Sequence, residues 1–317
     1  MSEDFIAVLA NPHAGRGRHR GLLPGVLDTL GGAGLPVRLL TAGTGAEAEW
    51  ACHRAVEEGA TALVAVGGDG TVHRALQAVA GRPVGFGVVA AGTGNDFADA
   101  VGVPGEALKA AEAITAALTA GRDHRVDAAR VTSAAGGDRA TGTAGGDRVT
   151  GTAGGQRWFC AVLAAGFDAL VNERANRMSR PRGPRRYDLA IALELARLRA
   201  REYHLVIDGT EHTVRAEIVA IGNGRSYGGG MRILPGADLT DGLLDVIWAA
   251  PLGRVGLARL KPRLRHGTHV TDRRVTVRRA KRITVRAEGI VGYADGERLG
   301  PLPLDVTCVP GAIRLLG

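Results

Sequence analysis

The sequence predicts a two-domain protein, in which an α/β domain built on a parallel sheet is followed by a domain rich in β-strands. The chain has 317 residues, about twice the length of an average single domain. Strand-like and helical segments alternate up to residue 125, which is typical of a parallel sheet with helices on both faces. From residue 126 onward, short strand-like runs dominate. The predicted domains are therefore residues 1–125 and 126–304.

The first domain contains apolar runs that indicate buried strands, separated by segments of helical composition. The predicted strands lie at residues 5–10, 36–41, 61–66 and at the start of 84–96. The predicted helices lie near 21–31 and at 46–60, 71–81 and 107–121. Gly59 stands where a glycine commonly ends a helix. Because helices connect the successive strands, we expect the strands to run parallel.

The second domain is predicted to be mostly β-structure with a single helix. The predicted strands lie at residues 125–132, 157–167, 203–209, 213–223, 242–249, 273–287 and 303–316. The segment 187–202 has the pattern of an amphipathic helix. The basic run 254–286 is interpreted as mostly strand, with its arginines on an exposed sheet face.

A repeated segment that is poor in apolar residues interrupts the second domain. GGDRATGTA at 136–144 is followed by GGDRVTGTA at 145–153. Gly and Thr at this density cannot bury enough apolar surface to fold alone. The Asp residues are too few for repeating calcium-binding turns. We therefore expect residues 134–156 to form a disordered loop insert.

Charge and composition restrict the partners and the compartment. The formal net charge of +8 favours nucleotides, nucleic acid or anionic lipid head groups. Nucleic acid is not expected, because aromatic side chains do not interleave with the basic ones as stacking on bases requires. The three cysteines are far apart and suggest neither disulfides nor a metal site, which favours the cytoplasm. We expect no signal peptide and no membrane-spanning segment.

The strongest chemical signal is GGDGT at residues 67–71, where a predicted strand is followed by a helix. Glycines there let backbone N–H groups approach a ligand, and the helix N-terminus adds partial positive charge. Asp69 can orient a hydrated metal ion, and Thr71 can donate its hydroxyl. The loop is neither a Walker A sequence nor GxGxxG. We interpret it as a cradle for nucleotide phosphates; a tight turn with a helix cap is the alternative.

Three neighbouring predicted strands end in residues of a similar kind. NPHAG at 11–15 follows the first strand, Thr41 ends the second, and GTGND at 92–96 follows the fourth. The carboxyl ends of parallel strands meet at one edge of a sheet, where open α/β sheets bind ligands. Together these loops predict a nucleotide site at that edge.

Later segments continue the same pattern of motifs. VDAA lies at 126–129, AAGFDA at 164–169, a glycine-rich segment at 222–246 and DGE at 295–297. In the order and spacing of these motifs, the chain resembles the diacylglycerol kinase catalytic family, in its soluble bacterial lipid-kinase branch. The resemblance covers nearly the whole chain except the repeat. It implies a phosphofructokinase- or NAD-kinase-like sheet in the first domain, a β-sandwich in the second, and a C-terminal segment 305–317 that packs back on the first.

The resemblance also implies a role for the acidic residues. Asp69, Asp96 and Asp127 would form a water-linked network that holds the catalytic Mg²⁺, and Glu297 would be the general base. A carboxylate near the lipid hydroxyl could take its proton. From the residues alone, the simpler interpretation of DGE is a hairpin turn with a solvated Glu297, and it is the resemblance that favours the base.

Two further sets of residues follow from the resemblance. A second, structural Mg²⁺ would be held by Asp238, Asp241 and the carbonyl of Leu243, although these Asp residues could also be simple turn formers. ATP would be lined by Asn11, Pro12, His13, Ala14, Gly15, Thr41, Gly67, Gly68, Asp69, Gly70, Thr71, Val72, His73 and Thr93. His73 replaces a residue that is often Asn in this family, and we expect a modest effect on nucleotide contacts.

The resulting hypothesis is an ATP-dependent lipid kinase that phosphorylates a membrane lipid such as diacylglycerol, giving phosphatidic acid; a sphingoid acceptor is a further option. The arginine-rich segment 174–201 suggests peripheral contact with an anionic membrane surface, the alternative being a solvated loop and an ordinary core helix. The resemblance also suggests a homodimer. An NAD kinase-like enzyme and a catalytically weak nucleotide- or lipid-binding regulator are the alternative functions.

Overall fold

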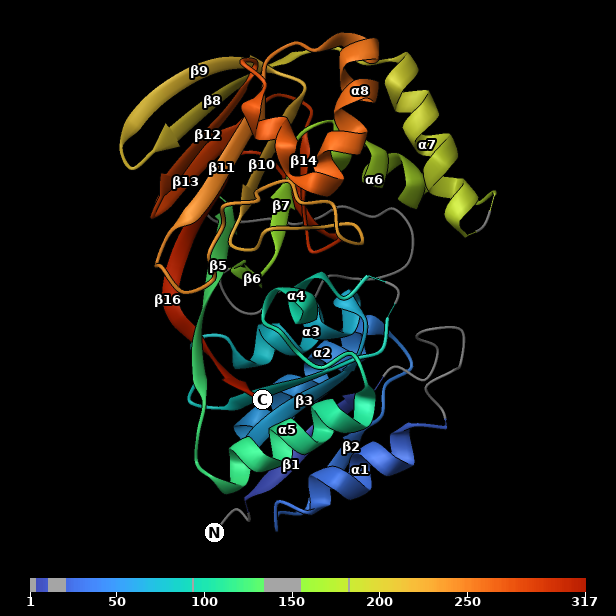
Figure 1. Ribbon diagram of the computed structural model, residues 1–317, viewed down its shortest axis with the longest axis vertical. Coiled ribbons are helices and arrows are strands. Elements are labelled where there is room, and N and C mark those ends of the chain that lie inside the picture. Colours follow the sequence, from blue (N-terminus) through green and yellow to red (C-terminus); the bar gives the residue numbers. More distant parts are fainter. Residues whose placement is uncertain (1–3, 11–20, 93, 134–154, 182) are drawn as a thin grey trace.

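The computed structural model describes residues 4–10, 21–92, 94–133, 155–181 and 183–317. It confirms the predicted fold class, with an N-terminal α/β domain on a parallel sheet and a C-terminal antiparallel β-sandwich (Figure 1). In Figure 1 the α/β part lies below the sandwich, and the last strand, β16, runs from one to the other.

The N-terminal sheet has the strand order β2-β1-β3-β4, and all of its neighbouring strands are parallel. These strands are β1 (Phe5–Ala10), β2 (Val37–Leu40), β3 (Ala60–Gly67) and β4 (Gly85–Ala90). The helices are α1 (Leu23–Gly31), α2 (Gly45–Glu57), α3 (Asp69–Val79), α4 (Asp96–Ala100) and α5 (Ala107–Thr119). Successive side chains of a strand point to opposite faces. Apolar residues of α2, α3 and α4 therefore form one buried cluster with the sheet, and those of α1 and α5 form another on its opposite face.

The C-terminal domain consists of two sheets with a shared core. One sheet has the order β12-β11-β10-β7-β14-β15, and the other continues the N-terminal sheet through β16, β13, β8 and β9, with β5 attached to β16 and β6 attached to β5. Buried side chains from both sheets, such as Leu205, Ile221 and Val246, form one cluster between them. The strands are β5 (His124–Ser133), β6 (Arg157–Phe159), β7 (Val162–Ala164), β8 (Arg201–Ile207), β9 (Thr210–Ala216), β10 (Ile218–Gly222), β11 (Leu244–Ala249), β12 (Val275–Ala280), β13 (Arg282–Arg286), β14 (Val291–Ala294), β15 (Glu297–Pro301) and β16 (Leu304–Leu316).

The last strand joins the two domains in one continuous sheet. The end of β16, Arg314–Leu316, pairs in parallel with Gly85–Gly87 of β4. Its earlier part pairs antiparallel with β5 and with β13. Leu316 also packs against Gly85, where a Cβ atom would lie 2.7 Å from Leu316 Cδ1. The C-terminal segment is thus part of the N-terminal sheet.

The prediction of a single helix in the second domain was wrong. The described residues of that domain contain the helices α6 (Phe167–Arg177), α7 (Pro184–Ala196) and α8 (Gly253–His266), and a short 3₁₀ turn at Thr268–Thr271. The start of the basic run 254–286 is helical rather than strand, because Leu257, Leu260 and Leu264 share one buried helix face while arginines occupy the exposed side.

Three predicted strands are also interrupted, and one of them, 273–287, is divided into β12 and β13 of different sheets. The 157–167 run contains β6 and β7 and ends where α6 begins, and the 213–223 run is divided into β9 and β10 at Glu217. Glu217 is buried, and its carboxylate accepts hydrogen bonds from the N–H groups of Leu252 and Gly253 at the start of α8. The predicted disordered insert 134–156 lies outside the described residues except for its last two positions.

A buried hydrogen bond in the sandwich gives a testable prediction about stability. The hydroxyl of Tyr203, on β8, donates to the carbonyl of Ala165 at 2.8 Å. Tyr203→Phe removes the donor and leaves this carbonyl unpaired, so we expect the free energy of unfolding to fall by about 1–2 kcal/mol. Urea unfolding of the variant measures this change. Tyr187→Phe, at an exposed position, is the matched control and should not differ from wild type.

Candidate active site

Two glycine-containing loops lie in contact at the carboxyl edge of the N-terminal sheet. β3 ends at Gly67 and α3 begins at Asp69, whereas β4 ends at Ala90 and is followed by Gly92. A Cβ atom on Gly92 would lie 2.4 Å from the Cα atom of Gly68, and one on Gly94 would lie 2.4 Å from Asp69 Oδ2. No real Cβ contact is so short, so the two loops can approach this closely only with glycine at these positions.

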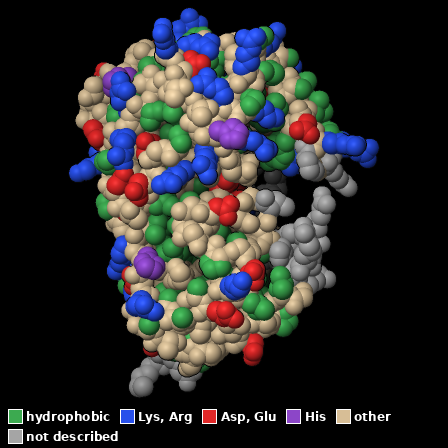
Figure 2. Space-filling model, viewed as in Figure 1, with side chains coloured by type: hydrophobic (Ala, Val, Ile, Leu, Met, Phe, Trp, Pro, Cys, Tyr) green, Lys and Arg blue, Asp and Glu red, His purple; other side chains and the backbone are tan. Residues whose placement is uncertain are grey.

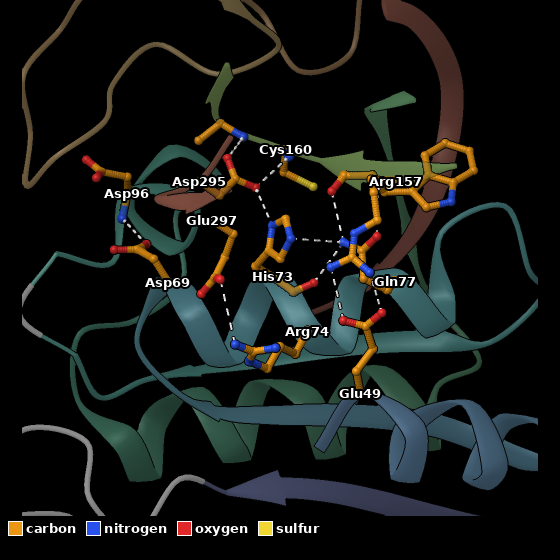
Figure 3. A network of polar contacts seen from close by, with 12 residues as sticks. Glu49, Asp69, His73, Arg74, Gln77, Asp96, Arg157, Cys160, Asp295 and Glu297 are labelled. Atoms are coloured by element: carbon orange, nitrogen blue, oxygen red, sulfur yellow. Dashed lines mark hydrogen bonds and ion pairs between the residues drawn. The ribbon is translucent and has the colours of Figure 1, made fainter. Parts of the chain in front are cut away.

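The side-chain carboxylate of Asp69 holds the second loop by binding backbone N–H groups of that loop. Its carboxylate accepts hydrogen bonds from the N–H groups of Asn95 (3.0 Å) and Asp96 (2.8 Å). Asn95 has a left-handed backbone with φ of 63°, a conformation that Asn tolerates well. Burial raises the pKa of Asp69, and the neighbouring Asp96 carboxylate raises it further, whereas the two N–H groups oppose this rise. Two acids, Asp69 and Asp96, therefore lie close together here (Figure 3).

Asp96 connects this acidic pair to the second domain. Its buried carboxylate accepts hydrogen bonds from the N–H groups of Gly229 (3.0 Å) and Gly230 (2.9 Å). Both glycines have positive φ, at 81° and 91°, which side chains other than glycine rarely adopt. The glycine-rich loop of the second domain is thus fixed directly over the start of α4.

The structure places Asp127 in a different set of contacts. Its carboxylate oxygens accept hydrogen bonds from the N–H groups of Gly242 and Gly311, each at 2.7 Å. Asn223 also donates its side-chain amide to the Asp127 carbonyl at 2.7 Å. Within the described residues, these hydrogen bonds connect β5 to β16 and to the loop before β11, and they do not reach Asp69. A role for Asp127 in binding Mg²⁺ stays a prediction.

Glu297 is brought over the start of α3 by a tight hairpin. Asp295 and Gly296 connect β14 to β15 with positive φ values of 51° and 83°, as in the two-residue turns typical of β-hairpins. The Glu297 carboxylate lies 3.6 Å from the guanidinium of Arg74. A Cβ atom on Gly70 would lie 3.6 Å from Glu297 Oε1. DGE is therefore a hairpin turn that also places its glutamate beside GGDGT.

Asp295, which sequence reasoning passed over, links the two domains beneath this hairpin. Its carboxylate accepts hydrogen bonds from the N–H groups of Cys160 (3.1 Å) and Ala161 (3.0 Å). It also lies 3.5 Å from Nδ1 of His73, whose ring is completely buried (Figure 3). An Asp-Gly pair between two short strands signals such a turn, but nothing local to the sequence identifies the partners of Asp295.

His73 and its neighbour along α3 belong to this contact between domains. Gln77 exchanges hydrogen bonds with the backbone of Trp158 at 2.9 Å in both directions, and its amide also donates to the His73 carbonyl. Arg157 forms an ion pair with the buried Glu49 of α2 (Figure 3). His73 was predicted to line ATP, but the structure places its ring against Asp295 and Gln77.

The other residues that were predicted to line ATP fall into three groups. Thr41 is exposed at the end of β2, and Gly67–Gly70 span the last residue of β3, the connecting Gly68 and the first two residues of α3. Thr71 and Val72 are buried within α3, where Thr71 packs against Gly67. The remaining predicted residues lie outside the described residues: Asn11, Pro12, His13, Ala14, Gly15 and Thr93.

The predicted second metal site lies in the loop before β11. Asp238 accepts hydrogen bonds from the N–H and hydroxyl groups of Thr240, which lower its pKa. Asp241 accepts from the N–H group of Leu243 and forms an ion pair with Arg279. In the part of the chain that the structure describes, no group of three or more His, Cys, Asp or Glu residues is arranged to hold a metal ion. This site stays a prediction.

A cavity of about 840 Å³ extends from the acidic residues into the second domain. Asp69, Asp96, Asp295 and Glu297 belong to its lining. Its other walls are mostly apolar and come from α6, α7, α8, the sheet that contains β10 and the loop between β10 and β11. They include Phe167, Val171, Ile191, Leu195, Ile218, Met231, Leu257 and Leu264. The sequence did not predict this cavity, because its lining comes from segments that are far apart along the chain.

Comparison with known proteins follows the same division of the chain. Residues 6–131 match the family model described as the diacylglycerol kinase catalytic domain, and residues 161–317 match that of the YegS C-terminal NAD kinase beta sandwich-like domain. A diacylglycerol kinase of Mycobacterium tuberculosis is 39% identical over 312 residues, which cover 98% of this chain and 94% of that protein. A Stenotrophomonas maltophilia protein named "probable lipid kinase YegS-like" is 28% identical over 90% of this chain and 87% of its own length.

Solved structures agree with this assignment at the level of the fold. A diacylglycerol kinase from Bacillus anthracis superposes with a TM-score of 0.68 and 18% identity, covering 100% of this chain and 97% of that one. A second structure from the same organism gives a TM-score of 0.75 at 20% identity, with 100% and 96% of the two chains covered. With both family models matched and 39% identity to a relative over nearly its whole length, this chain belongs to the diacylglycerol kinase catalytic-domain family.

Proposed function

We propose that this protein is an ATP-dependent lipid kinase, which transfers the γ-phosphoryl group of ATP to the hydroxyl of a membrane lipid. Diacylglycerol, giving phosphatidic acid, is the simplest acceptor. The observation that carries the proposal is the cavity, because Asp69, Asp96 and Glu297 line it together with the apolar side chains of α6, α7 and α8. NAD would bury polar groups against these apolar walls, which is unfavourable, so the NAD kinase-like alternative is less well supported.

The loops at the sheet edge are suited to bind the phosphates of ATP. Residues 67–70 include the two glycines before α3 and the first two residues of this helix. Their backbone N–H groups and the helix N-terminus favour the binding of an anion there. Thr41, at the end of the strand β2, belongs to the same edge. In this arrangement the γ-phosphate would lie between the loops of the first domain and Glu297 of the second.

Glu297 is placed to act as the general base. The acceptor hydroxyl would attack the γ-phosphorus, the Glu297 carboxylate would take its proton, and ADP would leave. Arg74 holds the Glu297 side chain in position through their contact of 3.6 Å. Phosphoryl transfer depends mainly on positioning and charge neutralisation, and the ion pair and the hairpin supply the positioning.

The acidic pair fits the requirements of Mg²⁺. The pKa of Asp69 is raised by the nearby Asp96 carboxylate, a repulsion that a divalent cation would relieve. Each of their oxygens accepts one N–H group and keeps a further lone pair. Mg²⁺ commonly binds through one or two carboxylates and retained waters. When bound with ATP, it would neutralise the charge of the phosphates.

The helices around the cavity suggest how the protein meets its lipid. Tyr187, Leu189 and Leu193 of α7 are exposed apolar side chains, so α7 is not an ordinary core helix. Arg185 is exposed on the same helix, and Figure 2 shows many Lys and Arg side chains over the upper half of the molecule. None of the helices in the described residues combines the length and hydropathy needed to cross a membrane. We infer that α7 contacts an anionic bilayer surface, next to the cavity that it lines.

The first prediction concerns the base. Glu297→Gln keeps the size of the side chain but cannot accept the proton, so we expect kcat for lipid phosphorylation to fall by about 10²- to 10⁴-fold, while ATP binding is retained. The measurement is transfer of labelled phosphate to micellar diacylglycerol, sphingosine and NAD. Glu288→Gln, at an exposed position, is the control.

The outcomes separate the alternative functions. Transfer to a lipid that is lost in Glu297→Gln and kept in Glu288→Gln supports the kinase and its base. Transfer to NAD alone would overturn the lipid assignment. ATP binding without transfer to any acceptor would instead identify a nucleotide-binding regulator.

The second prediction concerns Asp69 and pH. An acid must be ionised to bind a cation, and burial has raised the pKa of Asp69, so the magnesium requirement of the enzyme should increase as the pH falls through this raised pKa. Above this pKa, Asp69→Asn should weaken the apparent affinity for magnesium by at least about 10-fold, and the difference from wild type should shrink as the pH falls below it. Titration of activity with MgCl₂ at several pH values measures both effects. Asp99→Asn, on the exposed side of α4, should retain the wild-type profile, and an unchanged affinity in Asp69→Asn would contradict the assignment.

The third prediction concerns the membrane surface. Each cation near an anionic bilayer contributes about 1 kcal/mol, so Arg185→Gln should lower partitioning onto vesicles that contain phosphatidylglycerol by roughly fivefold, with no effect on pure phosphatidylcholine vesicles. Cosedimentation measures this partitioning. Arg282→Gln, exposed on β13, is the control, and an equal loss in both variants would show that only net charge matters.

A further inference from the structure

A second cavity, of about 680 Å³, lies on another face of α6 from the cavity described above, here called the first cavity. Asp168 and Val171 of this helix line the first cavity, whereas Leu170, Arg174 and Arg177 line the second. Residues three or four positions apart share a helix face, so α6 separates the two cavities. Among the described residues, Phe167 alone lines both. None of the acids proposed for catalysis belongs to the described wall of the second cavity.

Arginine is the most frequent residue in the wall of the second cavity. Five arginines and three glutamates line it: Arg174, Arg177, Arg197, Arg199, Arg201, Glu173, Glu194 and Glu217. The three acids already have partners. Glu194 forms an ion pair with Arg174, and Glu173 forms one with Arg177. Glu217 accepts hydrogen bonds from two backbone N–H groups at the start of α8.

The other three arginines have no carboxylate partner in the part of the chain that the structure describes. Arg197 and Arg199 are exposed, and within the same residues their side chains form neither a hydrogen bond nor an ion pair. Arg201, at the start of β8, is partly buried and donates to the carbonyl of Glu288 at 3.3 Å. Like charges that line one cavity repel each other, and a bound anion would relieve this repulsion. Guanidinium groups are suited to phosphate, because their paired N–H groups match its oxygens.

The rest of the wall indicates what kind of phosphate compound fits. Phe167, Leu170, Met178 and Leu198 line the cavity together with the arginines. A free phosphate ion cannot cover these apolar side chains, whereas the hydrocarbon of a phospholipid removes them from water, which is favourable.

The position of the cavity also favours a lipid. The helix α7 has three exposed apolar side chains, Tyr187, Leu189 and Leu193. Its last turn, with Glu194, and the following Arg197 line the second cavity. A bilayer in contact with the exposed side chains of α7 would therefore have its phosphates close to the arginines.

We propose that the second cavity is a binding site for an anionic phospholipid, whose phosphate is held by Arg197, Arg199 and Arg201 and whose hydrocarbon packs on the apolar wall. The site is distinct from the site of the acceptor, because α6 separates it from the acidic residues. One bound lipid would anchor the protein to an anionic bilayer, in addition to the diffuse attraction of its net charge. This inference goes beyond the proposed kinase activity, since binding needs neither ATP nor phosphoryl transfer.

The test measures the binding of dihexanoyl phosphatidylserine, as monomers in solution, by isothermal titration calorimetry. This lipid has an anionic head group with a phosphate and no hydroxyl group to phosphorylate. The double variant Arg197→Gln/Arg199→Gln removes two exposed phosphate ligands, so we expect its affinity to fall by roughly 10- to 100-fold. Arg273→Gln/Arg282→Gln, also at exposed positions, loses the same charge outside the cavity and should bind as wild type does. An equal loss in both double variants, or no loss in the first, would overturn the site.

Two further ligands distinguish a lipid from a free anion. Inorganic phosphate and glycerol 3-phosphate carry the charge without the hydrocarbon, so both should bind at least about 10-fold more weakly than the lipid. Binding of either as tightly as the lipid would overturn the assignment to a phospholipid.

Phosphate transfer to diacylglycerol in neutral detergent micelles separates this inference from the proposed function. Transfer should be unchanged in Arg197→Gln/Arg199→Gln, because the second cavity lies apart from the acidic residues. Loss of transfer in that variant, with its fold intact, would overturn the separation of the two sites. Absence of transfer by wild type, with phosphatidylserine binding that depends on these arginines, would overturn the kinase proposal and support the phospholipid site.

Discussion

Hydrogen bonds from backbone N–H groups to buried carboxylates are the interactions on which the arrangement of this site depends. Asp96 of the first domain binds the N–H groups of residues 229 and 230, and Asp295 of the second domain binds those of residues 160 and 161. Hydrogen bonds that involve an ionised group are stronger than neutral ones. Each carboxylate also fixes two adjacent N–H groups, so it sets the orientation of a loop as well as its distance. The bonds of Asp96 join the two domains, whereas those of Asp295 fix its own hairpin within the second domain, where its carboxylate lies 3.5 Å from Nδ1 of His73 in the first.

The same interactions explain why reactive groups from distant segments meet. Asp69 fixes the loop that carries Asp96, and the hairpin that contains Asp295 carries Glu297. The structural hydrogen bonds and the proposed catalytic groups therefore lie within one or two residues of each other. A change in the contact between domains would move the proposed base relative to the phosphate loops. If Glu297 is the base, the stability of this contact is a condition for the proposed phosphoryl transfer.

Much of the fold could be predicted from local patterns, and the failures have a common cause. Apolar runs alternating with helical segments correctly indicated the parallel sheet. The helices α6 and α8 were missed, because the density of arginines in α8 obscured the spacing of Leu257, Leu260 and Leu264, and because the first helical residues of α6 continue an apolar strand. Residue type alone could not show which apolar runs would lie against a neighbouring sheet.

The sequence by itself determined the glycine-containing loops at the sheet edge and the family, because glycines, a carboxylate and strand ends are properties of short segments. GGDGT at 67–71 and DGE at 295–297 are both recognisable without a structure. Only the tertiary structure decided that Glu297 lies beside Gly70 and Arg74, and that Asp295 lies beside His73. It alone also produced the apolar cavity. The physical reason is that burial and pairing depend on which distant segments pack together, and no local pattern specifies those partners.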